Sequence, residues 1–381
     1  LLYRMGDFYE LFFEDAQTAA PVLGITLTRR RQNDAIEAPM CGVPHHAFDG
    51  YLGKLLDAGF RVAVAEQVED PAKAKGLVRR EIIRTHTPGT ISDTELLEGA
   101  QHCYLAALGG DEEQASLAWI EISTGEFEGI RAGGREALTE HLARLAPREV
   151  LVAEDWDGWH HVWPSELPQP VVTPIANEEF STSTGEDRLR RALGVSSLHG
   201  FGLESGETLV GMAGALIGYV ESTQKGGLNH VRAFVRREAG DALVIDRSTV
   251  RNLELERAAD GRRQGSLVDI LDHTKTRMGS RLLRDRLMRP SIDLDEIGER
   301  HRAVAELADD AGLLDKVRGS LEDIPDLERL AARVGLGLAT PRELQALRAG
   351  LDLLPGVHSA LSAATSSRLH LLAERLDPML D

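Results

Sequence analysis

The hydrophobic pattern of this chain changes partway along its length, and this change limits the chain to more than one domain. Residues 1–230 contain short apolar runs and alternating segments between glycine-rich turns, which indicates strands mixed with helices. From about residue 237, apolar residues recur at helical spacing between clear helix-start signals. At 381 residues the chain is also too long for one compact core. We therefore expect a multidomain protein.

The segment of residues 1–90 is predicted to be a small α/β domain. Residues 60–67 and 80–84 have strand-like patterns, and the apolar residues of 51–56 recur at helical spacing. The turn Thr87-Pro88-Gly89-Thr90 closes this domain. The acidic residues 91–100 then form a predicted linker.

Residues 101–230 are predicted to form a second α/β domain. Three strand candidates come first, then a helix and an apolar strand, an order typical of a ribonuclease-H-like sheet. Four prolines between Pro164 and Pro174 predict a loop there. The expected elements are strands at 104–108, 116–122 and 127–130, a helix at 135–145 and a strand at 149–152.

Residues 231–381 are predicted to be all-α. Ser266 resembles a helix cap, and a helix over 281–288 should end at Pro290. Thr340-Pro341-Arg342-Glu343 combines a cap, a proline at the first helical position and a glutamate three residues after the cap. The leucines that follow are expected to pack in a core, namely Leu344, Leu347, Leu351 and Leu354.

The net charge of −18 is concentrated in one part of the chain. Residues 1–90 carry 11 basic and 12 acidic side chains, residues 91–230 carry 8 and 23, and residues 231–381 carry 24 and 26. The middle part should therefore avoid nucleic-acid phosphates, which bind Lys and Arg. In the first segment, Arg29-Arg30-Arg31 and Arg79-Arg80 with Arg84 are local basic clusters, and a solvated surface is the alternative for both.

Two cysteines, Cys41 and Cys103, in so long a chain indicate free thiols and a reducing compartment. No apolar run is long enough to span a membrane, and no leader pattern is recognisable. We expect a cytoplasmic protein without membrane contact. The chain lacks an initial Met and begins within an apolar run, so we expect a fragment.

The segment Gly6-Asp7-Phe8-Tyr9-Glu10 is the strongest functional signal. It lies between an apolar run and the amphipathic residues 11–16, which predicts a strand, a tight glycine turn and a helix start. An aromatic ring and a carboxylate would then stand exposed at one junction. Alone, this pattern is common, because such a Phe is usually core and such a Glu usually solvated or at a helix N-terminus.

The longer string from Tyr3 to Phe12 resembles the N-terminal signature of the bacterial MutS family of DNA mismatch-repair proteins. Further segments resemble the same family in the same order. They are Pro39-Met40-Cys41-Gly42-Val43-Pro44-His45-His46, Thr87-Pro88-Gly89-Thr90, Asp246 to Leu255, and Arg277-Met278-Gly279-Ser280-Arg281-Leu282-Leu283.

The resemblance implies a mismatch-recognition domain at 1–90, a connector domain at 101–230 and an incomplete core and lever domain at 231–381. It also implies that Phe8 inserts into the DNA minor groove and that Glu10 contacts the mispaired base. Met5 and Tyr9 are expected to support the wedge, and Arg79, Arg80 and Arg84 to contact the backbone. The implied partners are mismatched or looped double-stranded DNA, a second copy of the full-length protein and a repair protein of the MutL family.

No phosphate-binding loop of the form Gly-x-x-x-x-Gly-Lys-Ser/Thr occurs. We therefore expect no enzymatic activity and no cofactor in this chain, with ATP and Mg²⁺ bound by a C-terminal ATPase and dimerisation domain of the full-length protein. Two other functions stay open. One is a Mg²⁺-dependent nuclease built around Glu121, and the other is a scaffold that binds only proteins. His45 and His46 have no Cys or second His at ligand spacing, so we expect a loop or packing role for them and no metal site.

Overall fold

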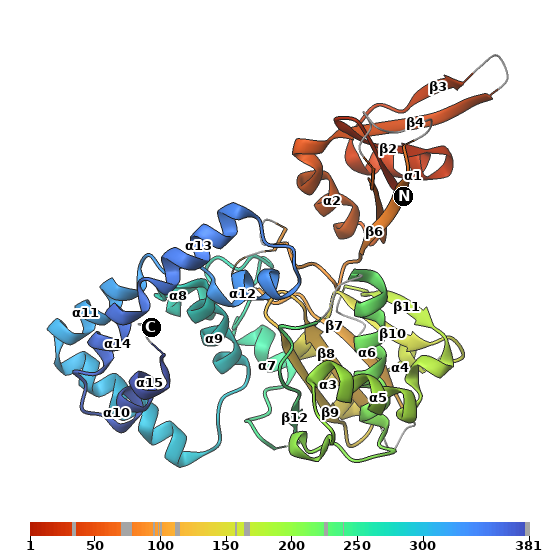
Figure 1. The fold of residues 1–381 in the computed structure, drawn as a ribbon. Coiled ribbons are helices and arrows are strands. Elements are labelled where there is room, and N and C mark those ends of the chain that lie inside the picture. Colours follow the sequence, from red (N-terminus) through yellow and green to blue (C-terminus); the bar gives the residue numbers. More distant parts are fainter. Residues whose placement is uncertain are drawn as a thin grey trace.

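The computed structural model describes residues 1–32, 36–69, 78–93, 96–97, 99, 101–110, 115–156, 158–163, 168–224, 228–238 and 240–377. Figure 1 shows a first domain that stands away from the rest, a second domain built on a central sheet, and a group of helices at the C-terminal end. The first domain joins the others through β6 (Arg80–His86), which contacts α6 (Thr208–Gln224) of the second domain.

The first domain is a six-stranded sheet covered on one face by two helices. The helices are α1 (Phe13–Leu23) and α2 (Phe48–Asp57), and their buried residues share one core with the strands. The strand order is β3-β4-β2-β1-β5-β6, and only β1 and β5 pair in parallel. The other strands are β1 (Leu2–Met5), β2 (Phe8–Phe12), β3 (Thr28–Gln32), β4 (Ile36–Pro44) and β5 (Val62–Gln67).

These elements confirm the strands at 60–67 and 80–84, the helix through 51–56 and the turn at Thr87, where the Thr90 N–H donates to the Thr87 carbonyl over 3.1 Å. One prediction was wrong. The Gly6 turn leads into strand β2 and not into a helix, because Phe8–Phe12 pair with β1 on one side and β4 on the other. The helix starts only at Phe13. Helical spacing in so short a segment could not reveal that β2 pairs with β4, about 30 residues later in the sequence.

The second domain has a six-stranded sheet with the order β11-β10-β7-β8-β9-β12. Strands β7 (Leu105–Gly109), β8 (Ser116–Glu121) and β9 (Glu126–Arg131) form the predicted meander, followed by α3 (Arg135–Leu145) and β10 (Glu149–Ala153) as expected. The edge strands β11 (Val171–Ile175) and β12 (Val235–Arg237) pair in parallel with β10 and β9.

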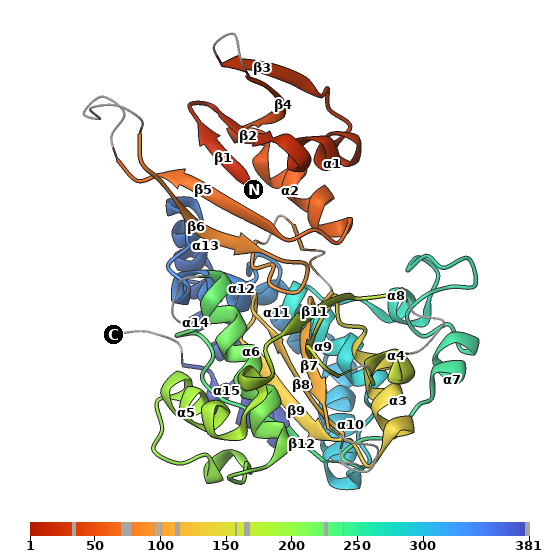
Figure 2. The ribbon, with the colours of Figure 1, turned by 90° about the vertical axis from the view of Figure 1, so that its right-hand side faces the viewer.

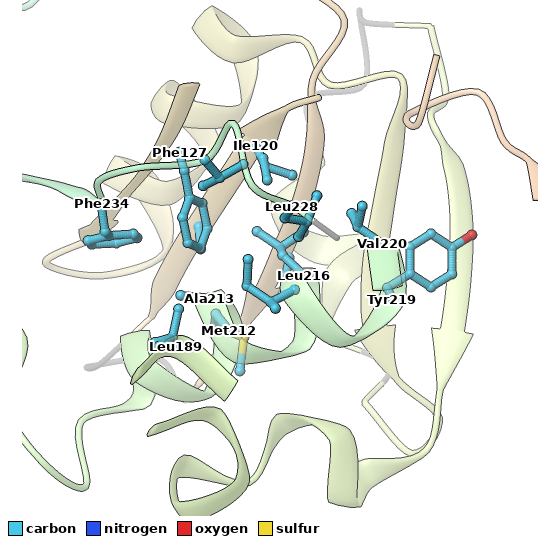
Figure 3. Packing of buried hydrophobic residues seen from close by; sticks show 14 of the residues in the cluster. Ile120, Phe127, Leu189, Met212, Ala213, Leu216, Tyr219, Val220, Leu228 and Phe234 are labelled. Atoms are coloured by element: carbon cyan, nitrogen blue, oxygen red, sulfur yellow. The ribbon is translucent and has the colours of Figure 1, made fainter. Parts of the chain in front are cut away.

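Two separate cores lie on the two faces of this sheet, because successive strand residues point to opposite sides. Leu105, Ile120 and Leu151 face α6, whereas Ala106, Trp119 and Val150 face α3. Figure 3 shows Met212 and Leu216 of α6 packed near Ile120 and Phe127 of the sheet. Helix α6 is buried on nearly all sides, and α5 (Thr182–Leu193) packs along it. A Cβ at Gly214 of α6 would lie 2.2 Å from the Gly185 Cα of α5, so these helices approach backbone to backbone.

The expectation of a loop from Pro164 to Pro174 was wrong for its last part. Residues 171–175 form β11, although the strand contains Pro174. Proline is tolerated there because β11 is an edge strand, and a missing N–H on the open side costs no ladder hydrogen bond. Residues 164–167 lie outside the described residues.

The C-terminal part is helical, as predicted, after the short strand β12. Residues 235–237 extend the sheet of the second domain beyond residue 230, and three residues carry too little periodicity to be recognised. The helices are α7 (Arg247–Asn252), α8 (Leu267–Leu271), α9 (Arg277–Met288), α10 (Leu294–Asp309), α11 (Ala311–Leu321), α12 (Leu327–Gly335), α13 (Pro341–Leu351), α14 (Leu354–Leu361) and α15 (Ser367–Arg375).

The helix-start signals are confirmed. Ser266 caps α8, and Thr340 with Glu343 forms a full capping box on α13. Helix α9 begins at Arg277, before the predicted start, because Thr276 caps it. The leucine face was wrong in part: Leu354 is buried, but it belongs to α14, and Leu344 is 47% exposed.

The second domain and the helices meet around buried arginines. Arg329 of α12 is 1% exposed, donates to the Gln101 carbonyl over 2.7 Å, and lies 3.5 Å from the Glu121 carboxylate at the end of β8. Arg281 of α9 donates to Asp326 over 2.6 Å and to the Gly99 carbonyl over 3.0 Å. Figure 2 shows the sheet and these helices side by side below the first domain. Within the described part of the chain, no helix combines the length and the apolar character that crossing a membrane requires.

We predict that Arg329→Ala lowers the free energy of unfolding by about 3–5 kcal/mol, because it leaves the buried Glu121 carboxylate without one of its cations. Arg348→Ala is the matched control, since Arg348 is exposed on α13 and forms an exposed ion pair with Asp352 at 3.7 Å. Urea unfolding measures both variants. Equal effects for the two substitutions would show that the buried arginine does not hold this interface together.

Candidate functional site

Phe8 is an exposed ring at the start of a central strand. Gly6 has φ +62°, a left-handed conformation that permits the tight turn between β1 and β2. The Asp7 carbonyl of this turn accepts a hydrogen bond from the His45 N–H at 2.8 Å. Phe8 follows directly, pairs across the hairpin with the half-buried Met5, and is 47% exposed. A ring fixed to a braced strand in this way can reach a ligand without unfolding anything.

Tyr9 anchors the strand from the opposite face. Its side chain is 4% exposed, lies 4.5 Å from the Phe48 ring and 5.6 Å from the His45 ring between centroids, and donates to the Glu66 carboxylate. Burial, together with this hydrogen bond, raises the pKa of Tyr9 well above its ordinary value, so the phenol stays protonated. The guanidinium of Arg4 lies 5.3 Å from the centre of the same ring.

Glu10 lies on the same side of β2 as Phe8, because the two residues are two positions apart on one strand. Its side chain is 16% exposed and pairs with the Arg30 guanidinium of β3 at 2.8 Å. Gly42 of β4 stands opposite Glu10, and a Cβ there would lie 3.3 Å from the Tyr9 carbonyl oxygen. The aromatic ring and the carboxylate thus lie on one face of a strand and not at a helix start, and only Phe8 is exposed as expected, because Glu10 is covered in its ion pair with Arg30.

The basic clusters lie at the two edges of the sheet, since β3 and β6 are its outer strands. Arg29 pairs with Glu37 at 2.9 Å and is well exposed, and the side chain of Arg31 lies outside the described residues. Arg79 is exposed and pairs with Glu81. Arg80 donates to the Arg4 carbonyl over 2.8 Å, which places it near the Phe8 end of the sheet.

Arg84 corrects one expectation. Its side chain is 7% exposed, and it donates to Gln224 Oε1 over 2.5 Å and to Ser92 Oγ over 2.7 Å. Burial lowers the pKa of Arg84 to about 10, which still leaves it charged at neutral pH. Its hydrogen bonds are committed to α6 and to the segment after β6, so it joins two domains and cannot reach DNA phosphates in this arrangement.

A second joint between these domains was missed by sequence reasoning. The buried Glu149 carboxylate of β10 accepts hydrogen bonds from Thr87 Oγ1 and from the Gly89 N–H, the latter at 3.0 Å. A Cβ at Gly89 would lie 2.7 Å from the Glu149 Cβ, so only glycine fits there. The Thr-Pro-Gly-Thr motif indicated a turn, but no local signal indicated that its partner lies about 60 residues later.

Glu121 is the residue on which the nuclease alternative depends. It is fully buried, lies 2.5 Å from His102 Nδ1, accepts from Ser123, and faces Arg329. These contacts hold the pKa of Glu121 below its ordinary value despite burial. Within the described residues, one group of side chains could hold a metal ion, because its potential ligand atoms lie within 4.8 Å of one another. It consists of His102, Glu121 and Glu126.

That group behaves as an ion-pair network. Hydrogen bonds to Asp285 and Glu121 outweigh burial and raise the pKa of His102 to about 10, so a protonated imidazole pairs with these carboxylates. The nuclease alternative therefore gains no support. His45 stacks on Tyr9, which is a packing contact, and His46 is not part of any such group within the described residues.

Comparison with known proteins gives consistent matches along the chain. Family models described as MutS domain I, MutS domain II and MutS domain III match residues 1–95, 103–232 and 248–381. A protein named DNA mismatch repair protein MutS from Syntrophobacter fumaroxidans is 42% identical over 387 residues, which cover 100% of this chain and 43% of that protein.

Further relatives with the same name are similar to a comparable degree. The protein from Dinoroseobacter shibae is 46% identical over 92% of this chain and 40% of its own length. The protein from Cereibacter sphaeroides (strain ATCC 17025) is 44% identical over 100% of this chain and 43% of its own length. The chain thus spans less than half the length of these relatives. Because three domain models of one family match in order and these relatives align along at least 92% of the chain, the chain belongs to the MutS family.

Proposed function

We propose that the complete protein recognises mismatched or looped DNA in post-replicative repair, with Phe8 as a minor-groove wedge and Glu10 as the contact to the mispaired base. The observation that carries this proposal is the placement of an exposed Phe8 ring and the Glu10 carboxylate on one face of a strand that Tyr9 anchors from behind. The relatives' name, DNA mismatch repair protein MutS, points to the same function.

The wedge would sense how easily a base-pair step deforms. Inserting an apolar side chain unstacks a step at a cost of about a few kcal/mol, whereas stacking a base on an aromatic ring returns about 1–3 kcal/mol. At a matched step these terms nearly cancel. At a mismatch the bases are already poorly stacked, so insertion becomes favourable. One exposed ring therefore detects many different errors without reading a sequence.

Glu10 would add selectivity through its charge. A carboxylate beside phosphates is repelled in a matched duplex, whereas a displaced base edge offers it a hydrogen bond. Arg30 compensates this charge in the free protein. On DNA, the same guanidinium has phosphates as competing partners. Met5 and Tyr9 support the wedge in this proposal, and Arg79 and Arg80 approach the backbone.

The remaining assignments follow from family membership. We propose residues 1–90 as the mismatch-recognition domain, 91–100 as the linker, 101–230 as a ribonuclease-H-like connector domain and 231–381 as part of the core and lever domain. The meander, helix and parallel strand of the second sheet support the connector assignment. The complete protein would dimerise, hydrolyse ATP with Mg²⁺ outside these residues, bind a MutL-family protein and act in the cytoplasm.

We predict that Phe8→Ala in the complete protein removes the preference for a G·T mismatch over a matched duplex, because the stacking contribution of about 1–3 kcal/mol is lost. The melting temperature should stay unchanged, since the ring is exposed. Phe13→Ala is the control, as Phe13 is 58% exposed beyond the other end of β2. Fluorescence titrations measure the affinities, and a collapse of the melting temperature with Phe8→Ala would identify a core residue instead.

Glu10→Gln should strengthen binding to a matched duplex roughly five- to tenfold, or about 1–1.4 kcal/mol, because it removes the repelled charge but keeps a hydrogen-bonding group. Binding to the mismatched duplex should change less. The same titration compares the two affinities. If their ratio equals that of the wild type, the carboxylate does not act through repulsion.

Arg30→Ala should weaken binding to both duplexes, because it removes a cation and leaves Glu10 uncompensated. In a Glu10→Gln background the loss should be smaller, with a coupling of at least about 0.5 kcal/mol between the two positions. Arg29→Ala serves as the control, since its partner is Glu37 and its effect should add to that of Glu10→Gln. Additive effects for Arg30 and Glu10 would contradict their proposed coupling.

A further inference from the structure

A cavity of about 90 Å³, lined by both apolar and charged side chains, lies between the second domain and helix α9, far in sequence from Phe8. Four of its lining residues are arginines, namely Arg144 from α3, Arg237 from β12, Arg284 from α9 and Arg289, which follows α9. Three carboxylates also line it, namely Glu126, Glu128 and Asp285. The pairing among these groups decides what the cavity can hold.

The carboxylates are already occupied. Glu128 accepts two hydrogen bonds from Arg237, and its more distant contact is Arg289 at 3.7 Å. Asp285 lies 3.2 Å from His102 Nε2. Glu126 accepts from the Tyr104 hydroxyl at 3.1 Å, and burial raises its pKa to about 7, so it is only partly charged at neutral pH.

Arg144 is a cation of this cavity without a carboxylate partner among the described residues. Its guanidinium donates to His141 Nδ1 over 2.6 Å and, among the described residues, has no carboxylate within ion-pair distance. His141 is neutral, because burial and the charges of Arg144 and Arg289 lower its pKa to about 4. Burial also lowers the pKa of Arg144 to about 10, and the charge of Arg289 acts in the same direction. Two guanidiniums that repel each other therefore share one cavity.

We propose that this cavity binds a tetrahedral oxyanion of phosphate size between Arg144 and Arg289. Arg144 is partly buried, and a charge withdrawn from water gains from an anionic partner, whereas the end of helix α3 offers it only modest compensation. Guanidiniums match the oxygens of phosphate and sulfate in planar, two-pronged hydrogen bonds. The cavity of about 90 Å³ has room for one such ion. Since α3 belongs to the sheet domain and Arg289 follows α9, the anion would connect two domains, independently of mismatch recognition.

A thermal-shift titration of the 381-residue chain tests this site. Sodium phosphate should raise the melting temperature in a saturable way, beyond sodium chloride at equal ionic strength. Arg144→Gln should weaken the apparent phosphate affinity at least about tenfold, because it removes charge-assisted hydrogen bonds, and Arg144→Lys should retain part of it. The exposed Arg348→Gln has the same change in net charge and should respond as the wild type.

A parallel titration with AMP distinguishes a free phosphate ion from the phosphate group of a monoester. A response to phosphate alone assigns a free ion, and a response to both assigns a phosphate monoester whose remainder stays outside the cavity. If Arg144→Gln does not fold, Arg289→Gln takes its place in the same comparison. Equal responses to phosphate and chloride, or a wild-type phosphate response in the cavity variant, would overturn the proposal.

Discussion

The arrangement of this molecule depends on buried charges that are satisfied between segments far apart in sequence. Two arginines of the helical part donate hydrogen bonds to the segment before the second sheet: Arg329 to the Gln101 carbonyl and Arg281 to the Gly99 carbonyl. Arg329 also faces the Glu121 carboxylate. Glu149 in turn binds the turn at Thr87 and Gly89. Taking such charges out of water is costly unless every partner is in place. These joints therefore fix where the domains meet far more sharply than apolar contacts, which tolerate sliding.

The proposed wedge is also held in a fixed geometry. A strand alternates its side chains between two faces, so burying Tyr9 and Leu11 places Phe8 and Glu10 on the other face. The hydroxyl of Tyr9, its ring contacts and the backbone bond from His45 to the Gly6–Asp7 turn hold this strand end in place. An exposed ring on a rigid strand loses little conformational freedom when it binds, which suits it to sense small differences in DNA stacking.

The net negative charge of the chain is concentrated in residues 91–230. Three acidic residues of the middle part, Glu121, Glu128 and Glu149, are buried and bonded within the protein. Arg84 belongs to a basic cluster in the sequence, but its side chain is buried and links two domains through Gln224 and Ser92. Clusters of charge in a sequence therefore do not by themselves identify a surface.

Local signals in the sequence determined the elements whose causes are local. The strand alternation of 104–130, the helix at 135–145 and the capping box at Thr340 all follow from neighbouring residues, and each is confirmed. The exposed Phe8 beside its glycine turn was also foreseeable. Only the tertiary structure decided that Phe8–Phe12 is a strand, that Pro174 lies in an edge strand, and that Arg30 pairs with Glu10. Each of these depends on a partner supplied by another segment, and pairing across such distances leaves no periodicity in the sequence itself.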